Sequence, residues 1–196
     1  MANEKYQNKY RIPSNRWQGY DYGSNGCYFV TICTKNRFHY FGEIVENVET
    51  RFIASQQCMQ IDNIEMRLIA SPQGIIAKKI WFEIPNQFTF VLLDEFVIMP
   101  NHIHGILVFS KNDEIMEDTS KKGGITRGRN PMLYQELGRV IRWYKGRVSF
   151  ECRSFGDFGW QERFYDRVIR NNHELENERV YIYNNQQKWK DDELYT

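Results

Sequence analysis

His102 and His104 have a spacing that suits chemistry at a single site. Apolar, β-prone residues flank the pair at 96–98 and 106–109, and Pro100-Asn101 marks a tight turn between two strands. Because alternate residues of a strand share a face, both imidazoles are predicted to project to the same side. Two adjacent imidazoles can bind one divalent cation or one phosphate, although a bare His-x-His also occurs on the solvated face of ordinary strands.

Tyr181 and Asn185 are the second candidate pair, four residues apart on a helix predicted over 173–187. A tyrosine phenol is a poor nucleophile at its usual pKa of about 10, but it becomes useful when it attacks phosphorus polarised by a metal. An asparagine carbonyl oxygen one turn away is a suitable ligand for Mg²⁺ or Mn²⁺. The alternative from spacing alone is that Tyr181 packs in the core and the asparagines end the helix. Tyr183 faces about 200° away from Tyr181.

Strands and helices around these residues can be predicted from hydrophobic periodicity. Residues 27–34 form a strand that is apolar on both faces, which is typical of a central strand, and further strands cover 88–96 and 97–109. Ser71 and Pro72 are the N-cap and first residue of a helix over 72–84, ended by Pro85. A second helix covers 131–150. Residues 43–49 and 65–69 are ambiguous and could each form a short strand. Asp94 and Glu95 either support an imidazole or mark a strand end.

Composition places the chain among globular proteins with a real core. Of its 196 residues 41% are hydrophobic, and the net charge of +1 argues for no particular partner. Aromatic residues reach 15%, which suggests a stacking surface. Eight lysines and arginines lie between Lys121 and Arg147, opposed only by Glu136. Such charges contact an anion or simply form a solvated helix face. Residues 1–19, with Arg16 and Trp17, are either a nucleic-acid-binding arm or a disordered leader.

The cysteines and the absence of apolar runs indicate a cytoplasmic protein. Cys27, Cys33, Cys58 and Cys152 form no zinc-type spacing and are predicted to be buried thiols. The N-terminus shows no signal-peptide pattern, and no apolar run approaches the length of a membrane span.

Three blocks of the sequence together resemble the single-tyrosine HUH transposases, within them the branch of REP-associated tyrosine transposases. The first joins residues 16–22 to 28–32, and the second is residues 94–105, with Met-Pro-Asn-His-Ile-His-Gly as its most specific part. The third runs through residues 141–147, 160–161, 165–171 and 181–185. The similarity spans nearly the whole chain in the family's order.

This resemblance implies an α+β, ferredoxin-like fold, with an antiparallel sheet flanked by helices, the histidine motif on a central strand and the tyrosine on a C-terminal helix. It implies a single-stranded DNA endonuclease and strand transferase that recognises hairpin DNA. His102 and His104 would bind Mg²⁺ or Mn²⁺, Tyr181 would form a covalent 5′-phosphotyrosine, and Asn185 would be the further metal ligand. The candidate DNA contacts are Arg16, Trp17, Arg142, Lys145 and Arg147.

Some features leave alternatives open. Gln186 follows the paired asparagines where close relatives often have proline, and Tyr165 or Tyr183 could replace Tyr181 as nucleophile. A hairpin-DNA-binding protein that does not cleave is one alternative, and a His-x-His metal hydrolase is another, although His39 and His173 lie in unpromising contexts. The predicted organisation is an arm over 1–19, a transposase domain over 20–187 with a mobile loop at about 110–130, and a tail over 188–196. The protein would be a monomer or a homodimer.

Overall fold

The computed structural model describes residues 5–6, 9–10, 20–50, 61–111 and 136–195. Arg16, Trp17, Cys58 and most of the loop predicted at 110–130 lie outside these residues. Within the predicted arm, two short strands, β1 (Lys5–Tyr6) and β2 (Lys9–Tyr10), pair with each other. No helix among the described residues is long and apolar enough to cross a membrane.

A four-stranded antiparallel sheet forms the centre of the protein. Its strands follow the order β6-β7-β3-β8. The two central strands are β3 (Gly26–Cys33) and β7 (His102–Phe109), and the two edge strands are β6 (Val91–Ile98) and β8 (Tyr165–Ile169). The predictions that the first strong strand is central and that the histidines lie on a central strand are therefore confirmed.

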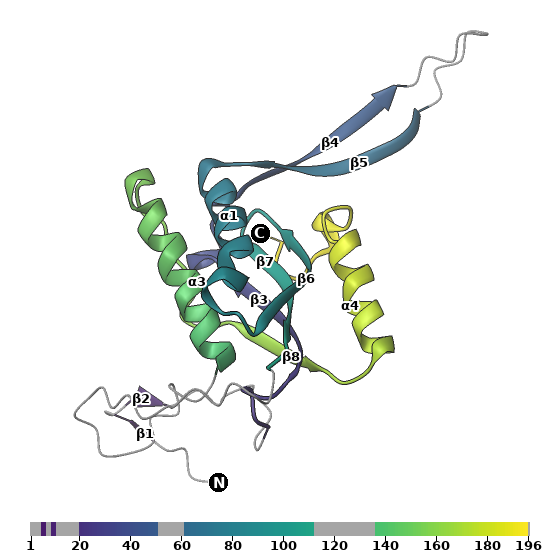
Figure 1. Ribbon diagram of the computed structural model, residues 1–196. Helices are drawn as coiled ribbons and strands as arrows, with labels where there is room; N and C mark the ends of the chain where they lie inside the picture. Colours follow the sequence, from purple (N-terminus) through teal and green to yellow (C-terminus); the bar gives the residue numbers. More distant parts are fainter. Residues whose placement is uncertain (1–4, 7–8, 11–19, 51–60, 112–135, 196) are drawn as a thin grey trace, which may run out of the picture.

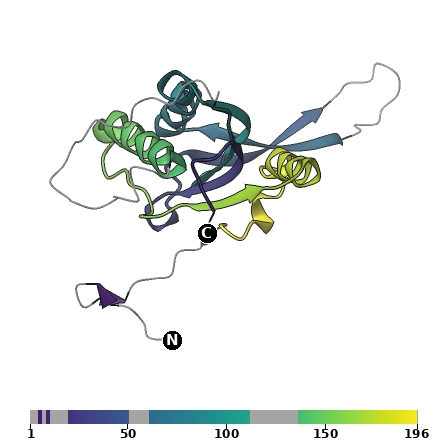
Figure 2. The ribbon, with the colours of Figure 1, turned by 60° about the horizontal axis from the view of Figure 1, so that its bottom comes forward.

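Helices cover both faces of this sheet. Apart from a hairpin inserted between the first two, the elements run β3, α1 (Pro72–Gln87), β6, β7, α3 (Glu136–Cys152), β8 along the chain, which is the βαββαβ connection of a ferredoxin-like fold. Figures 1 and 2 show α1 and α3 together on one face, and α4 (Asn172–Asn184) on the other. The fold class predicted from the sequence is confirmed.

Side-chain alternation along β7 separates the core from the histidines. Ile103 and Leu107 pack into the large hydrophobic core beneath α1 and α3. Ile106 points to the opposite face, where it packs with Ile182 of α4. His102 and His104 share that second face because they are four and two residues from Ile106, respectively. The strand therefore points both imidazoles at α4.

The residues at 43–49 and 65–69, whose structure the sequence left open, are strands in the structure. The ambiguous residues form a long hairpin, β4 (Gly42–Thr50) with β5 (Ile61–Ala70), which projects from the body in Figure 1.

Ser71 caps α1 as predicted, because its Oγ accepts from the Gly74 amide at 3.0 Å. The prediction that Pro85 ends this helix is wrong: α1 continues to Gln87. Proline removes only one amide donor, and the Phe88 amide still donates to the Ile84 carbonyl at 2.9 Å.

The strand β8 was not predicted, because polar and aromatic residues alternate in Tyr165-Asp166-Arg167. After it, Asn171 caps α4 by accepting from the Glu174 amide at 2.9 Å. Beyond α4 the chain folds back over the sheet toward β7 (Figure 1) through the short 3₁₀ helix η3 (Trp189–Asp191). Two further 3₁₀ turns are η1 (Lys35–Arg37) and η2 (Arg153–Phe155).

Candidate active site

His102 and His104 lie side by side and are buried. Their ring centroids are 4.5 Å apart, and their side chains are almost fully shielded from solvent. His104 lies opposite Thr31 in the sheet, and His102 lies opposite Cys33. The predicted common face of the two imidazoles is confirmed.

A hydrogen bond fixes the orientation of each ring. Asn101 Oδ1 lies 2.7 Å from His102 Nδ1, and Thr31 Oγ1 lies 2.8 Å from His104 Nδ1. Because an amide oxygen only accepts, His102 Nδ1 must donate, which leaves the lone pair of the neutral ring on Nε2. That Nε2 atom is buried and has no hydrogen-bond partner among the described residues. It is therefore available to a cation.

Burial also keeps the two rings neutral. It lowers the pKa of His102 to about 3, helped by the positive charge of Arg37, and that of His104 to about 3, helped by His102. Neutral imidazole is the form that binds a metal ion.

The lowered histidine pKa values predict acid sensitivity. In the unfolded chain these rings protonate near pH 6.5, whereas the folded protein resists protonation down to about pH 3. The contribution of each ring to the free energy of unfolding is therefore fully present above about pH 6.5. As the pH falls toward 3, the unfolded chain binds protons that the folded protein does not, so the free energy of unfolding decreases by up to about 1.4 kcal/mol per pH unit for each ring. We expect His104→Gln to lose less unfolding free energy than wild type between pH 7 and pH 5 in urea titrations. Equal losses would contradict this assignment.

Tyr181 of α4 faces the histidine pair. Its Oη lies 3.3 Å from His104 Nε2, and its ring packs edge-on to both His104 and Phe29. Burial raises the pKa of Tyr181, as does Asp192, so the phenol keeps its proton. Tyr183 is 83% exposed, against 45% for Tyr181, so the predicted opposite orientation of these two tyrosines agrees with the structure.

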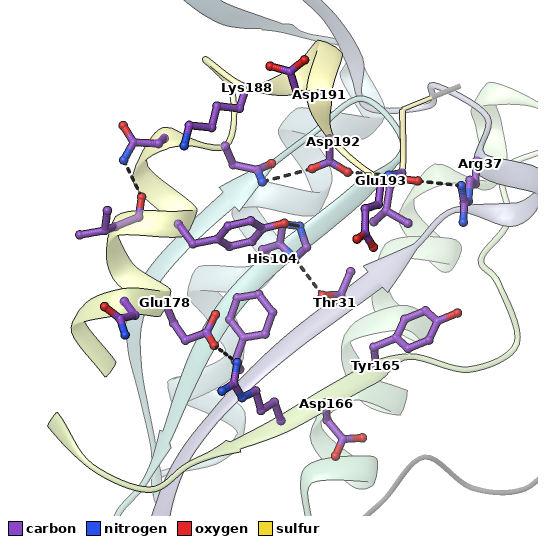
Figure 3. A pocket seen from close by; sticks show the side chains of 18 residues that line it. Thr31, Arg37, His104, Tyr165, Asp166, Glu178, Lys188, Asp191, Asp192 and Glu193 are labelled. Carbon is purple, nitrogen blue, oxygen red and sulfur yellow. Dashed lines mark hydrogen bonds and ion pairs between the residues drawn. The ribbon is translucent and has the colours of Figure 1, made fainter. Parts of the chain in front are cut away.

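Asn185 and Asp192 complete the buried cluster. Asn185 Nδ2 donates to Asp192 Oδ2 at 3.3 Å, and that carboxylate oxygen lies 4.0 Å from His102 Nε2. The ligand atoms of His102, His104 and Asp192 all lie within 4.8 Å of one another, which makes them a candidate metal group. Figure 3 shows Asp192, His104 and Thr31 around the same cavity.

The cavity beside this cluster has a volume of about 920 Å³ and opens to solvent. Aromatic side chains of Phe29 and Tyr165 line it, together with the basic side chains of Arg37 and Lys188. It lies between α4, β8 and the C-terminal segment, as Figure 3 shows.

The predicted basic contacts on α3 do not reach this cavity. Arg142, Lys145 and Arg147 belong to α3, which covers the opposite face of the sheet. Lys145 Nζ donates to the backbone carbonyls of Gln161 and Arg163, and Arg147 pairs with Glu151 at 3.1 Å.

Several site residues were missed by sequence reasoning. Thr31 is brought to His104 by strand register across 73 residues, and Asp192 arrives by the fold-back after α4. Asn101 is part of the motif, but its bond to His102 follows only from the turn geometry. Asp94, which the sequence offered as an imidazole support, instead forms a bidentate pair with Arg179, at 2.8 and 2.5 Å.

A solved structure of another protein has a similar fold. The chain resembles the solved structure of a REP-associated tyrosine transposase bound to a REP hairpin, with a TM-score of 0.53 and 17% identity over 90% of this chain and 74% of that one. The protein therefore shares the fold of this REP-associated tyrosine transposase, which confirms the resemblance noted in the sequence at the level of the fold.

A closer relative defines the family. No model of a known protein family matches the sequence. An uncharacterized protein of Haemophilus influenzae is 33% identical over 190 residues, covering 93% of this chain and 92% of that protein. The chain belongs to the same family as this H. influenzae protein.

Proposed function

We propose that this protein is a metal-dependent tyrosine transposase, a single-stranded DNA endonuclease and strand transferase that cuts near hairpin DNA. The observation that carries the proposal is the 3.3 Å approach of Tyr181 Oη to His104 Nε2, beside a second buried imidazole. A phenol that can act as a nucleophile thus lies beside two neutral imidazoles, the form of histidine that binds a metal ion. The fold shared with a REP-associated tyrosine transposase supports the same reaction class.

The polar atoms of the site fit a divalent cation. His102 Nε2 and Asn185 Oδ1 are both buried without a hydrogen-bond partner among the described residues. His102 and His104 would hold Mg²⁺ or Mn²⁺, and Asn185 is the candidate oxygen ligand predicted from the sequence. When bound, the cation supplies positive charge that polarises the scissile phosphate.

Tyr181 would be the attacking residue. A bond forms between its Oη and the phosphorus while the bond from phosphorus to the 3′ oxygen breaks. The phenol loses its proton and the leaving 3′ oxygen gains one, so a 5′-phosphotyrosine and a free 3′-hydroxyl remain. Attack by another 3′-hydroxyl would reverse the step and join two strands.

The cavity offers contacts to a single strand of DNA, beside the acidic side chains that also line it, Asp166, Glu178, Asp191, Asp192 and Glu193. Phe29 and Tyr165 offer ring faces or edges to bases, and Arg37 and Lys188 offer positive charge to phosphates. Contacts of a hairpin stem with Arg16, Trp17, Arg142, Lys145 and Arg147 stay predictions. A monomer and a homodimer are both compatible with this proposal.

A covalent-capture assay tests the proposal. The protein is mixed with labelled single-stranded hairpin DNA from the region flanking its gene, with Mn²⁺, Mg²⁺ or EDTA, and run on a denaturing gel. We expect a protein–DNA adduct with a divalent cation, none with EDTA, and none with His102→Ala. His173→Ala is the matched control, because this histidine is exposed at the start of α4.

Two other results would contradict the transposase. Tight binding in a native gel without any adduct would identify a hairpin-binding protein that does not cleave. Metal-dependent cleavage without an adduct would identify a hydrolase that uses a bound water.

A further inference from the structure

We infer that Asp192 is the third protein ligand of this divalent cation and that Asn185 holds the Asp192 carboxylate in place; the inference rests on the proposed function only for the presence of the cation. Sequence reasoning gave the third position to Asn185 and treated Asp192 as part of a tail. The arrangement of the two side chains reverses these roles.

The distances fit a shared ion. Asp192 Oδ2 lies 4.0 Å from His102 Nε2, and the ligand atoms of both histidines and Asp192 lie within 4.8 Å of one another. Ligand atoms at about 2.1 Å from an ion lie roughly 3 to 4 Å apart, so only small movements are needed to enclose one.

The facing atoms are both electron-rich. His102 donates from Nδ1 to Asn101, so the lone pair on Nε2 faces the carboxylate of Asp192. Two such atoms repel each other unless a proton or a cation lies between them. The burial of His102 Nε2 without a partner is therefore explained by a cation that binds both residues.

The buried negative charge of Asp192 also favours a bound cation. Its side chain is only 5% exposed, and burying a carboxylate costs free energy unless it is paired. Among the described residues its carboxylate contacts the Asn185 amide, the Leu194 backbone amide and neutral His102, with no lysine or arginine in ion-pair contact. A divalent cation would pair directly with this carboxylate, and carboxylate oxygen is the ligand that Mg²⁺ and Mn²⁺ prefer.

Asn185 orients this carboxylate through its Nδ2, while its Oδ1 is buried without a hydrogen-bond partner among the described residues. Its Nδ2 donates to Asp192 Oδ2 at 3.3 Å, and a carboxylate only accepts, so the NH₂ end of the amide must face Asp192. Metal-binding groups are commonly fixed by such hydrogen bonds from neighbouring side chains.

Asn101 ties the C-terminal segment to the histidine motif. Its Oδ1 accepts from His102, and its Nδ2 donates to the backbone carbonyl of Leu194 at 2.8 Å. The segment that carries Asp192 is thus held by the residue that orients His102. The metal centre joins the turn before β7 to the residues after α4.

Calorimetric titration of the full chain with MnCl₂, without DNA, tests the inference. We expect Asp192→Asn and Asp192→Ala to weaken Mn²⁺ binding about tenfold or more, and Asn185→Ala to weaken it less than Asp192→Ala does. Asp191→Asn removes the same charge from the neighbouring exposed residue and should change the affinity less than about twofold. His102→Ala should abolish the site. Thermal unfolding checks that each variant is folded.

The outcomes separate this inference from the proposed function. If the Asp192 variants bind Mn²⁺ like Asp191→Asn while His102→Ala does not bind, the inference is overturned and the histidine site stands. If Asn185→Ala instead abolishes binding, Asn185 is the third ligand. If folded wild-type protein binds no Mn²⁺, both the metal site and this inference fail. If Asp192→Ala keeps its affinity but cleaves DNA faster, the C-terminal segment blocks the cavity and the inference is wrong.

Discussion

Tyr181→Phe is expected to abolish the covalent protein–DNA adduct and to lower strand cleavage by about a thousandfold or more. The substitution removes only the phenolic oxygen, which is the atom 3.3 Å from His104 Nε2. Loss of a nucleophile removes the covalent route, whereas the site that binds and polarises the phosphate remains. The ring stays in place against Phe29 and His104, so folding and hairpin binding should change little. Denaturing gels measure the adduct, and native gels measure binding.

Tyr183→Phe is the matched control. Tyr183 is on the same helix, but its side chain is 83% exposed, so removing its hydroxyl should leave the adduct unchanged. An adduct that survives Tyr181→Phe and disappears in Tyr183→Phe would reverse the assignment. Tyr165 lines the same cavity, and loss of the adduct only in Tyr165→Phe would make that residue the nucleophile.

The two central strands were predictable because apolar, β-prone residues dominate β3 and the second half of β7. Their place in one antiparallel sheet was implied by the resemblance to the HUH transposases and not by the pattern of either strand. The edge strand β8 has a weaker pattern, since its side chains are partly exposed, and it is held by pairing with β3. Pro85 shows the limit of a local rule, because tertiary packing of Ile84 and Phe88 supports one more helical turn.

In the candidate site, too, some residues could be predicted from the local sequence and others are placed only by tertiary packing. The shared face of His102 and His104 follows from strand geometry over three residues. The spacing of Tyr181 and Asn185 gave their common helix face but not their approach to His104, which is set by how α4 packs on β7 through Ile106 and Ile182. Asp192 could not be predicted, since its position depends on a chain reversal held by single hydrogen bonds such as that of Asn101 to Leu194.

Gly105→Ala is expected to destabilise the protein by about 3 kcal/mol, because the residue after the second histidine has no room for a side chain. A Cβ at Gly105 would lie 2.3 Å from Trp81 Cζ2. Trp81 is fully buried, stacks on Phe96 with ring centroids 5.3 Å apart and meets Tyr144 edge-on at the same centroid distance. The indole cannot move aside without disturbing both rings, so β7 itself must shift.

Gly146→Ala is the control for this prediction. Gly146 lies within α3 with nothing near the position of an added Cβ, so alanine should stabilise the helix by about 0.5–1 kcal/mol. Urea-unfolding free energies measure both variants, and equal stabilities would show that the core around Trp81 adapts. A shift of β7 would also move His104 relative to Tyr181, so Gly105→Ala should lose cleavage under conditions in which it is still folded. The motif glycine would then act on the chemistry by letting Trp81 pack against β7, on the sheet face opposite the histidines.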